Sequence, residues 1–165
     1  MMGRVFLFGD NIDTDVLAPG QYMAAPLDVL ARHCLETVAP GFAVAVRSGD
    51  IILAGRNFGM GSSREQAAQA LKHLGIAGIV ARSFGGIFYR NAINLGLPVF
   101  AHDAPIAAED GDEVSLDVET ATLTHLRSGT ITNLDPLPGF LIELIRDGGL
   151  VPHLEKRFAA KESST

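Results

Sequence analysis

The chain has 165 residues, of which 47% are hydrophobic and 19% are charged, and its net charge is −6 at pH 7. This length and balance fit one globular domain with a sizeable core and exclude a disordered chain. The acidic balance argues against a nucleic-acid partner, and no apolar run reaches the roughly 18 residues that a membrane helix needs.

The cysteine content limits the metal chemistry of the chain. Cys34 is the one cysteine, so it cannot form an internal disulfide. It also cannot hold an iron–sulfur cluster alone, since such clusters need several thiolates. The run MMGRVFLFGDNID lacks the apolar stretch of a secretory signal. We therefore expect a reduced, cytoplasmic chain that binds no cofactor by itself.

The first 101 residues predict strands that alternate with helices. Short apolar runs predict strands, and apolar residues at a spacing of three and four predict helices. After a first strand, a polar loop covers residues 9–20. The predicted strands cover residues 3–8, 51–54, 78–81 and 97–101, and the predicted helices cover residues 27–34, 63–74 and 84–95. Such alternation is typical of parallel βαβ units.

The pattern changes after Asp103, where apolar and polar residues alternate. This alternation predicts short antiparallel strands around Val114–Val118, Ala121–His125 and residues 130–133. Residues 140–146 predict a last helix, ended by two glycines. The polar tail, about residues 156–165, is expected to fray. The sequence therefore predicts a single α/β domain over residues 1–165.

Residues 59–65 read GMGSSRE and allow two interpretations. Ser62 and Glu65 have the S-x-x-E spacing of a capping box at a helix start. The same helix start would also present free N–H groups and a positive partial charge to an anion. Arg64 adds a planar fork that matches a carboxylate. In such a field a serine hydroxyl loses its proton at less cost.

The segment GDNIDTD carries three aspartates in a loop. Turn-forming Asp and Asn residues explain it most simply, and the calcium-loop pattern lacks its glycine and its glutamate. The alternative is that Asp15 orients an arginine or a partner's histidine. The five histidines are scattered without metal-ligand spacing, so we predict no metal site.

Three segments together resemble the small subunits of 3-isopropylmalate dehydratase, in the aconitase superfamily. They read GDNIDTDVLAPGQYM, NFGMGSSREQA and ARSFGGIFYRNAINLGLPVF, in the order of that family. The resemblance runs from about Gly3 to Leu150. It implies a swivelling β/β/α domain that docks on a separate large subunit. It also implies a [4Fe–4S] cluster on that large subunit and a small dicarboxylate substrate held between the two chains.

The resemblance also implies roles for individual residues. Ser62 matches the base that removes a proton from carbon, and Ser63 and Arg64 match residues that bind substrate. Asp15 matches an aspartate of the active-site loop. The loop that follows helps to set specificity, and here it carries Tyr22, Met23 and Ala24.

The chain departs from the family pattern at several positions. Met60 and Gln66 stand where a cysteine and a histidine are common, and Gly85-Gly86 stands where the family has alanine and arginine. Homoaconitase relatives read Y-L-R-T in the specificity loop, with an arginine that grips a third carboxylate. Ala24 would leave that charge unpaired, which is costly in a closed site. We therefore expect an apolar substituent, such as isopropyl or methyl, instead of citrate or homocitrate.

The resulting hypothesis is one subunit of a hydro-lyase that isomerises 2- and 3-isopropylmalate in leucine biosynthesis. It would be active only with the large subunit. An alternative in the same class is a dimethylmalate or methylmalate (citraconate-type) hydro-lyase. Alternatives of other classes are a stand-alone anion-binding module and a purely structural partner.

Overall fold

The computed structural model describes residues 1–164 and builds them around one seven-stranded mixed sheet. The strand order is β4-β3-β2-β1-β5-β6-β7. Strands β1 to β4 are parallel, whereas β5 to β7 are antiparallel. The predicted α/β class is confirmed, with central βαβ units and a short antiparallel region nearer the C-terminus. The strands are β1 (Met2–Leu7), β2 (Ile51–Ala54), β3 (Gly78–Ala81), β4 (Val99–Ala101), β5 (Glu113–Asp117), β6 (Thr122–His125) and β7 (Ile131–Asn133).

The parallel strands form the centre of the core. Ile51, Ile52, Ile79 and Val80 are almost completely buried, as expected for strands whose two faces are both covered. Ile52 pairs with Phe6 on one side and with Ile79 on the other. The unbroken apolar runs in the sequence therefore reflect burial on both faces of the sheet.

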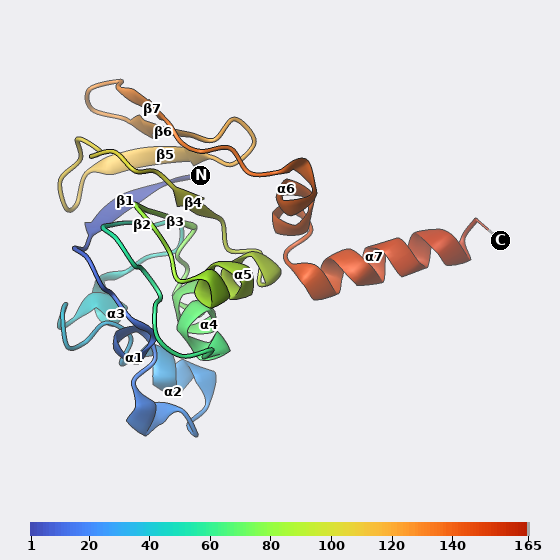
Figure 1. Cartoon of the computed structure of the whole chain (residues 1–165), viewed down its shortest axis with the longest axis horizontal. Coiled ribbons are helices and arrows are strands. Elements are labelled where there is room, and N and C mark those ends of the chain that lie inside the picture. Colours follow the sequence, from blue (N-terminus) through green and yellow to red (C-terminus); the bar gives the residue numbers. More distant parts are fainter. Residues whose placement is uncertain (165) are drawn as a thin grey trace.

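Helices provide the crossovers between the parallel strands. Figure 1 shows α1 to α5 gathered below the sheet. In α4 the predicted stripe of Ala67, Ala70 and Leu71 is buried, and this helix packs against α1, α2 and α5. The elements are α1 (Thr14–Leu17), the 3-10 turn η1 (Gly20–Tyr22), α2 (Leu27–Ala31), α3 (Phe42–Ala45), α4 (Glu65–His73) and α5 (Gly86–Asn94).

Two differences from the predicted elements have clear local causes. The helix predicted over residues 27–34 ends at Ala31, because Leu35 adopts a positive φ of 61° and donates its N–H to the carbonyl of Val16 in α1. The helix predicted from residue 84 starts at Gly86, because Phe84 pairs with Phe58 as an isolated parallel bridge.

The prediction of a last helix at residues 140–146 is wrong in that a further helix follows it. After α6 (Gly139–Arg146), helix α7 (Leu150–Glu162) projects away from the rest of the chain (Figure 1). Gly148 and Gly149 end α6 as expected, but Pro152 lies in the first turn of α7, where proline needs no N–H partner. The fraying of residues 156–165 stays a prediction, and residue 165 lies outside the described part. No helix within residues 1–164 is both long and apolar enough to cross a bilayer.

A buried carboxylate ties the start of β2 to β1. Asp50 is 3% exposed and accepts from the backbone N–H groups of Arg4 and Arg47 at 3.0 and 2.8 Å. The Arg4 guanidinium bonds its second oxygen at 2.8 Å. Burial alone would raise the pKa of Asp50, but the bond from the Arg4 side chain and the two backbone bonds outweigh it and lower this pKa.

Replacing Asp50 with Asn should destabilise the chain by about 2–3 kcal/mol, because a charge-assisted acceptor is lost beside buried donors. Since the folded pKa of Asp50 is lowered, its contribution is complete above the unfolded value of about 3.9 and is lost as pH falls through the folded value. Urea unfolding of wild type and variant from pH 2 to 7 measures both effects. Asp28→Asn, at an exposed pair with Arg32, is the control and should change stability little. An unchanged pH dependence below pH 4 in Asp50→Asn would contradict this assignment.

Candidate functional site

Three loops meet at the carboxyl ends of β1, β2 and β3, the edge where open parallel sheets bind ligands. The first loop covers residues 8–13, the second covers residues 55–64, and the third covers residues 82–85. Backbone hydrogen bonds join the second loop to both of its neighbours. Main-chain hydrogen bonds therefore set the positions of the three loops relative to one another.

The first and second loops continue the pairing of β1 with β2 beyond the strand ends. Asn11 N–H donates to the carbonyl of Arg56 at 2.8 Å, and Gly59 N–H donates to Ile12 at 2.6 Å. Thr14 N–H donates to the carbonyl of Met60 at 2.8 Å. These bonds bring the GDNIDTD and GMGSSRE segments side by side.

The third loop supports the second from the other side. Asn57 N–H donates to Ser83 Oγ at 2.8 Å, and Gly85 N–H donates to the carbonyl of Phe58 at 2.8 Å. A Cβ atom on Gly85 would lie 2.8 Å from the Gly59 carbonyl oxygen and 3.0 Å from Met60 Cα. The glycine at position 85 thus lets the loop with the exposed Met60 side chain pass close to the start of α5.

Ser62 lies at the end of the second loop, against a buried threonine. Its Oγ is 3.1 Å from Thr14 Oγ1, and its N–H donates to the same Thr14 oxygen at 3.0 Å. Thr14 is 3% exposed, whereas Ser62 is exposed. Sequence reasoning missed Thr14, because its contact with Ser62 spans 48 positions of the chain.

Arg64 is anchored to the loop that carries Asp15. Its Nη1 donates to Asp15 Oδ1 and, at 3.2 Å, to the carbonyl of Ala18. The Arg64 side chain is 25% exposed and that of Asp15 is 70% exposed. Within residues 1–164 no hydrogen bond occupies Nη2 or Nε of Arg64. The guanidinium is therefore held in place with donors left for another group.

The predicted capping box is not formed. Arg64 is the N-cap of α4, and no side chain of the described chain caps this helix. Ser62 lies two residues too early and bonds Thr14 instead. The first turn of α4 therefore keeps open N–H groups next to Ser62 and Arg64, which makes this end attractive to an anion.

The other predicted site residues are less closely tied to this group. Ser63 is exposed between Ser62 and Arg64. Tyr22 stacks on His33 with ring centroids 3.7 Å apart, so its ring is already engaged. Met23 is half-buried against the core, and Ala24 is exposed in the same segment. The start of this segment lies beside Arg64, since a Cβ on Gly20 would be 3.7 Å from Arg64 Nη2.

The residues present do not fit a metal cluster held by this chain. Cys34 is 1% exposed, and burial raises the pKa of its thiol, which disfavours the thiolate that a cluster needs. Within the described residues, no group of three or more His, Cys, Asp or Glu side chains is arranged to hold a metal ion.

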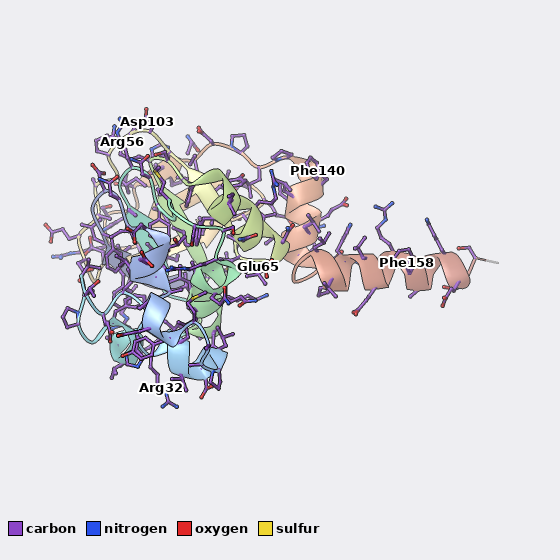
Figure 2. All side chains as sticks on the ribbon, turned by 60° about the horizontal axis from the view of Figure 1, so that its bottom comes forward. Arg32, Arg56, Glu65, Asp103, Phe140 and Phe158 are labelled. Carbon is purple, nitrogen blue, oxygen red and sulfur yellow. The ribbon has the colours of Figure 1, made fainter. Side chains whose placement is uncertain are left out.

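Two further groups in the described part of the chain, each made of several charged side chains, form no hydrogen bond or ion pair with Ser62. Figure 2 shows Arg56 beside Asp103, far from Glu65 at the start of α4. Asp103 is 3.2 Å from Arg56 Nη2 and 3.1 Å from Arg82 Nη2, so it bridges the second and third loops. Sequence reasoning missed this carboxylate, which stands alone after β4.

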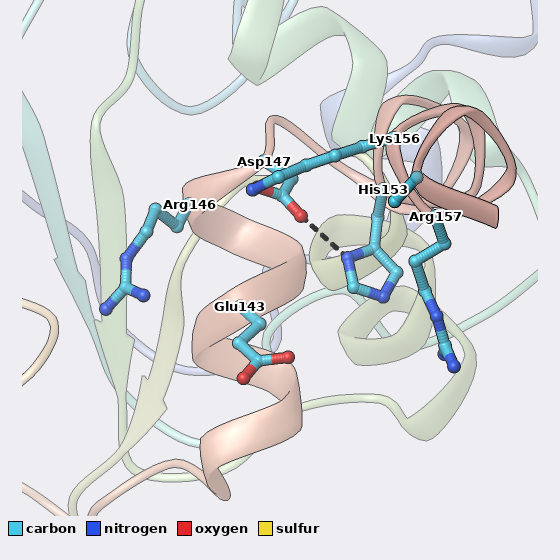
Figure 3. A pocket seen from close by; sticks show the side chains of 7 residues that line it. Glu143, Arg146, Asp147, His153, Lys156 and Arg157 are labelled. Atoms are coloured by element: carbon cyan, nitrogen blue, oxygen red, sulfur yellow. Dashed lines mark hydrogen bonds and ion pairs between the residues drawn. The ribbon is translucent and has the colours of Figure 1, made fainter. Parts of the chain in front are cut away.

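A pocket between α6 and α7 contains the second group (Figure 3). His153 Nδ1 lies 2.7 Å from Asp147, and Lys156 donates to the other oxygen of that carboxylate at 2.8 Å. The bonds from Lys156 and His153 lower the pKa of Asp147. This group fixes the corner between the two helices.

Comparison with known proteins gives one consistent result. Residues 42–102 match the family described as the aconitase C-terminal domain. The chain is 52% identical over 155 residues to the methanogen homoaconitase small subunit of Methanothermobacter thermautotrophicus, covering 93% of this chain and 90% of the relative. It is 48% identical over 156 residues to 3-isopropylmalate dehydratase small subunit 1 of Thermotoga maritima, covering 93% and 94%.

A solved structure has the same fold over nearly the whole chain. The crystal structure of 3-isopropylmalate dehydratase from Methanocaldococcus jannaschii superposes with a TM-score of 0.90 at 39% sequence identity. The match covers 99% of this chain and 98% of that one. Its extent includes both the loops around Ser62 and the C-terminal helix.

Replacing Gly61 with Ala should both destabilise the chain and displace Ser62. Gly61 has a φ of 120°, and a Cβ there would lie 2.8 Å from Thr14 Oγ1. Gly41 also has a positive φ, of 85°, but a Cβ there meets no atom within 4 Å. Gly41→Ala therefore measures the backbone strain alone, about 1 kcal/mol, and Gly61→Ala should cost about 1–2 kcal/mol more. Urea unfolding compares them, and equal losses would contradict the close contact with Thr14.

Proposed function

Because the chain belongs to the family of 3-isopropylmalate dehydratase small subunits, hydro-lyases that act as heteromers, we propose that it isomerises 2- and 3-isopropylmalate together with its large subunit. The reaction dehydrates the substrate and rehydrates it at the neighbouring carbon. The observation that carries this proposal is the contact of Thr14 and Asp15 with Ser62 and Arg64. This contact supports the proposal because it joins the two loops that carry the proposed base and the proposed carboxylate-binding group.

Ser62 is proposed as the base. Its Oγ would take a proton from the substrate carbon, the C–H electron pair would form the double bond, and hydroxide would leave from the adjacent carbon. A free serine is too weak an acid to act in this way. The positive end of α4 and the guanidinium of Arg64 both favour its deprotonated form.

Arg64 and the open N–H groups of α4 are proposed to bind a substrate carboxylate. Asp15 and Ala18 hold one nitrogen of the guanidinium, so the remaining donors are oriented before substrate arrives. Such orientation lowers the entropic cost of binding and gives bidentate recognition of a planar carboxylate. Ser63, next to Arg64, is proposed to add a hydroxyl contact.

The rest of the active site is proposed to come from the large subunit. Ser62 and Ser63 are exposed, so this chain does not enclose its own candidate base. Exclusion of bulk water from such a site strengthens the interactions of protein dipoles with the charge that develops during dehydration. We propose that the large subunit covers this edge and carries the [4Fe–4S] cluster, which would supply a Lewis acid for the departing hydroxide. The place of the enzyme in leucine biosynthesis and in the cytoplasm belongs to the same proposal.

The substrate side chain is proposed to be apolar because Ala24 offers no charge to a third carboxylate. The segment that contains Tyr22 and Met23 carries no charge either, and its first residue, Gly20, lies beside Arg64. A homoaconitase-type reaction is the second candidate, since one similar relative is a homoaconitase small subunit. A smaller alkylmalate, such as dimethylmalate, would fit the same apolar surface.

Replacing Ser62 with Ala in the assembled enzyme should lower kcat by about 10²–10⁴-fold, because the proton acceptor is removed. Arg64→Lys should raise KM by about 10-fold or more, since the planar fork is replaced by a point charge. Steady-state kinetics on isopropylmalate measure both. Ser115→Ala, in β5, controls for loss of a serine hydroxyl and should keep full activity. Wild-type turnover in Ser62→Ala would show that Ser62 is not the base.

The assembled wild-type enzyme should prefer isopropylmalate over homoaconitate by at least about 10²-fold in kcat/KM, because a third carboxylate has no partner near Ala24. Ala24→Arg should reduce this preference by supplying a cation from an exposed position. Ala107→Arg, an exposed residue between β4 and β5, tests for a general charge effect. Comparable or better activity of wild type on homoaconitate would favour the second candidate, and a higher kcat/KM on dimethylmalate would favour the smaller substrate.

A further inference from the structure

The hydroxyl of Thr14 is hydrogen-bonded to the side-chain oxygen of Ser62. Thr14 Oγ1 lies 3.1 Å from Ser62 Oγ, and it accepts the Ser62 N–H at 3.0 Å. A hydroxyl has one hydrogen to donate and two lone pairs to accept with. Since the Ser62 amide takes up one lone pair, the Thr14 hydrogen remains available for Ser62 Oγ.

The direction of this bond depends on the protonation state of Ser62. When Ser62 is a hydroxyl, either oxygen can donate. When Ser62 is an alkoxide it can only accept, so Thr14 must be the donor. A hydrogen bond to a charged oxygen is roughly twice as strong as a neutral one, so this contact stabilises the alkoxide more than the hydroxyl.

The surroundings of Thr14 hold its hydroxyl in place. Thr14 is 3% exposed, so water competes little for the bond. Its N–H donates to Met60 at 2.8 Å and its carbonyl accepts from Ala18 at 2.8 Å, which fixes the residue at the start of α1. Gly61 is the residue that lets the second loop approach, because any Cβ there would lie 2.8 Å from Thr14 Oγ1.

We propose that Thr14 is a positioning residue, whose hydroxyl orients Ser62 and donates a hydrogen bond to its deprotonated oxygen. This inference rests on the proposed function, in which Ser62 removes a proton from carbon. Thr14 itself does not touch the substrate and acts only through Ser62. Its role is to make the base available at a lower pH than a free serine would allow.

The test compares Thr14→Val, which keeps the shape and removes the hydroxyl, with Thr14→Ser, which keeps the hydroxyl. Each variant is assembled with the large subunit and assayed on isopropylmalate from pH 6 to 10. We expect Thr14→Val to lower kcat by about 10²-fold, in the range for loss of one donor to an oxyanion. We also expect its pH–rate profile to move to higher pH with KM changed little. Thr14→Ser should restore most of the activity and the wild-type profile.

Three controls distinguish a purely structural role of Thr14 from the proposed positioning role. Thr124→Val, on a half-buried residue of β6, tests the general effect of replacing a threonine hydroxyl. Urea unfolding shows whether Thr14→Val loses stability. The double variant Ser62→Ala/Thr14→Val should be no slower than Ser62→Ala alone, because Thr14 acts only through Ser62.

The outcomes distinguish this inference from the proposed function. If Ser62→Ala keeps full turnover, the proposed base is wrong and the inference fails with it. If Ser62→Ala is inactive but Thr14→Val keeps the wild-type rate and pH profile, only the inference fails. The inference also fails if Thr14→Ser is as slow as Thr14→Val, or if the second substitution slows Ser62→Ala further.

Discussion

The backbone pairing between the loops after β1 and β2 is the constraint on which the candidate site depends. It begins as regular parallel pairing, with Leu7 opposite Leu53, and continues through Asn11 with Arg56 and Thr14 with Met60. Because these bonds join main-chain atoms of both loops, they fix the path of each loop relative to the other. Ser62 and Arg64 can then be held at a sheet edge, with few side-chain contacts of their own.

This pairing requires backbone conformations that most residues avoid. Asn11 and Asn57 have φ values of 60° and 61°, and their side chains bond each other at 2.9 Å. Asparagine is one of the few residues that tolerates this region. Gly59 and Gly61 carry positive φ values of 76° and 120° in the same loop. The glycines of GMGSSRE thus serve the close approach to neighbouring chain segments, and the serines are exposed as a result.

The sequence predicts an element correctly wherever its burial imposes a regular spacing of apolar residues. The apolar runs of β2 and β3 and the stripe of α4 are predicted from it, because a strand covered on both faces is apolar throughout and a helix covered on one face repeats apolar residues every three or four positions. The sequence does not predict the local structure where a residue far away in the chain takes the hydrogen bonds that the local pattern would use. Ser62 has the spacing of a cap, yet Thr14, 48 positions earlier, takes its hydrogen bonds. Helix α7 is missed because Gly148 and Gly149 predict the end of the last helix, whereas a further helix begins directly after them at Leu150.

The charge distribution explains how an acidic chain can offer a site to an anion. The net charge of −6 is the total for the chain, and surface charges are screened beyond about 8–10 Å at physiological salt. Near Ser62 the decisive terms are short-range: the open N–H groups of α4 and the guanidinium of Arg64, which is only 25% exposed. Asp15 neutralises part of that guanidinium but is itself 70% exposed, so water weakens its field more than that of Arg64. Covering this edge with another protein surface would remove the water and strengthen every one of these interactions. Under the proposed function the site would therefore gain electrostatic strength on assembly, which is a physical reason for dividing an active site between two chains.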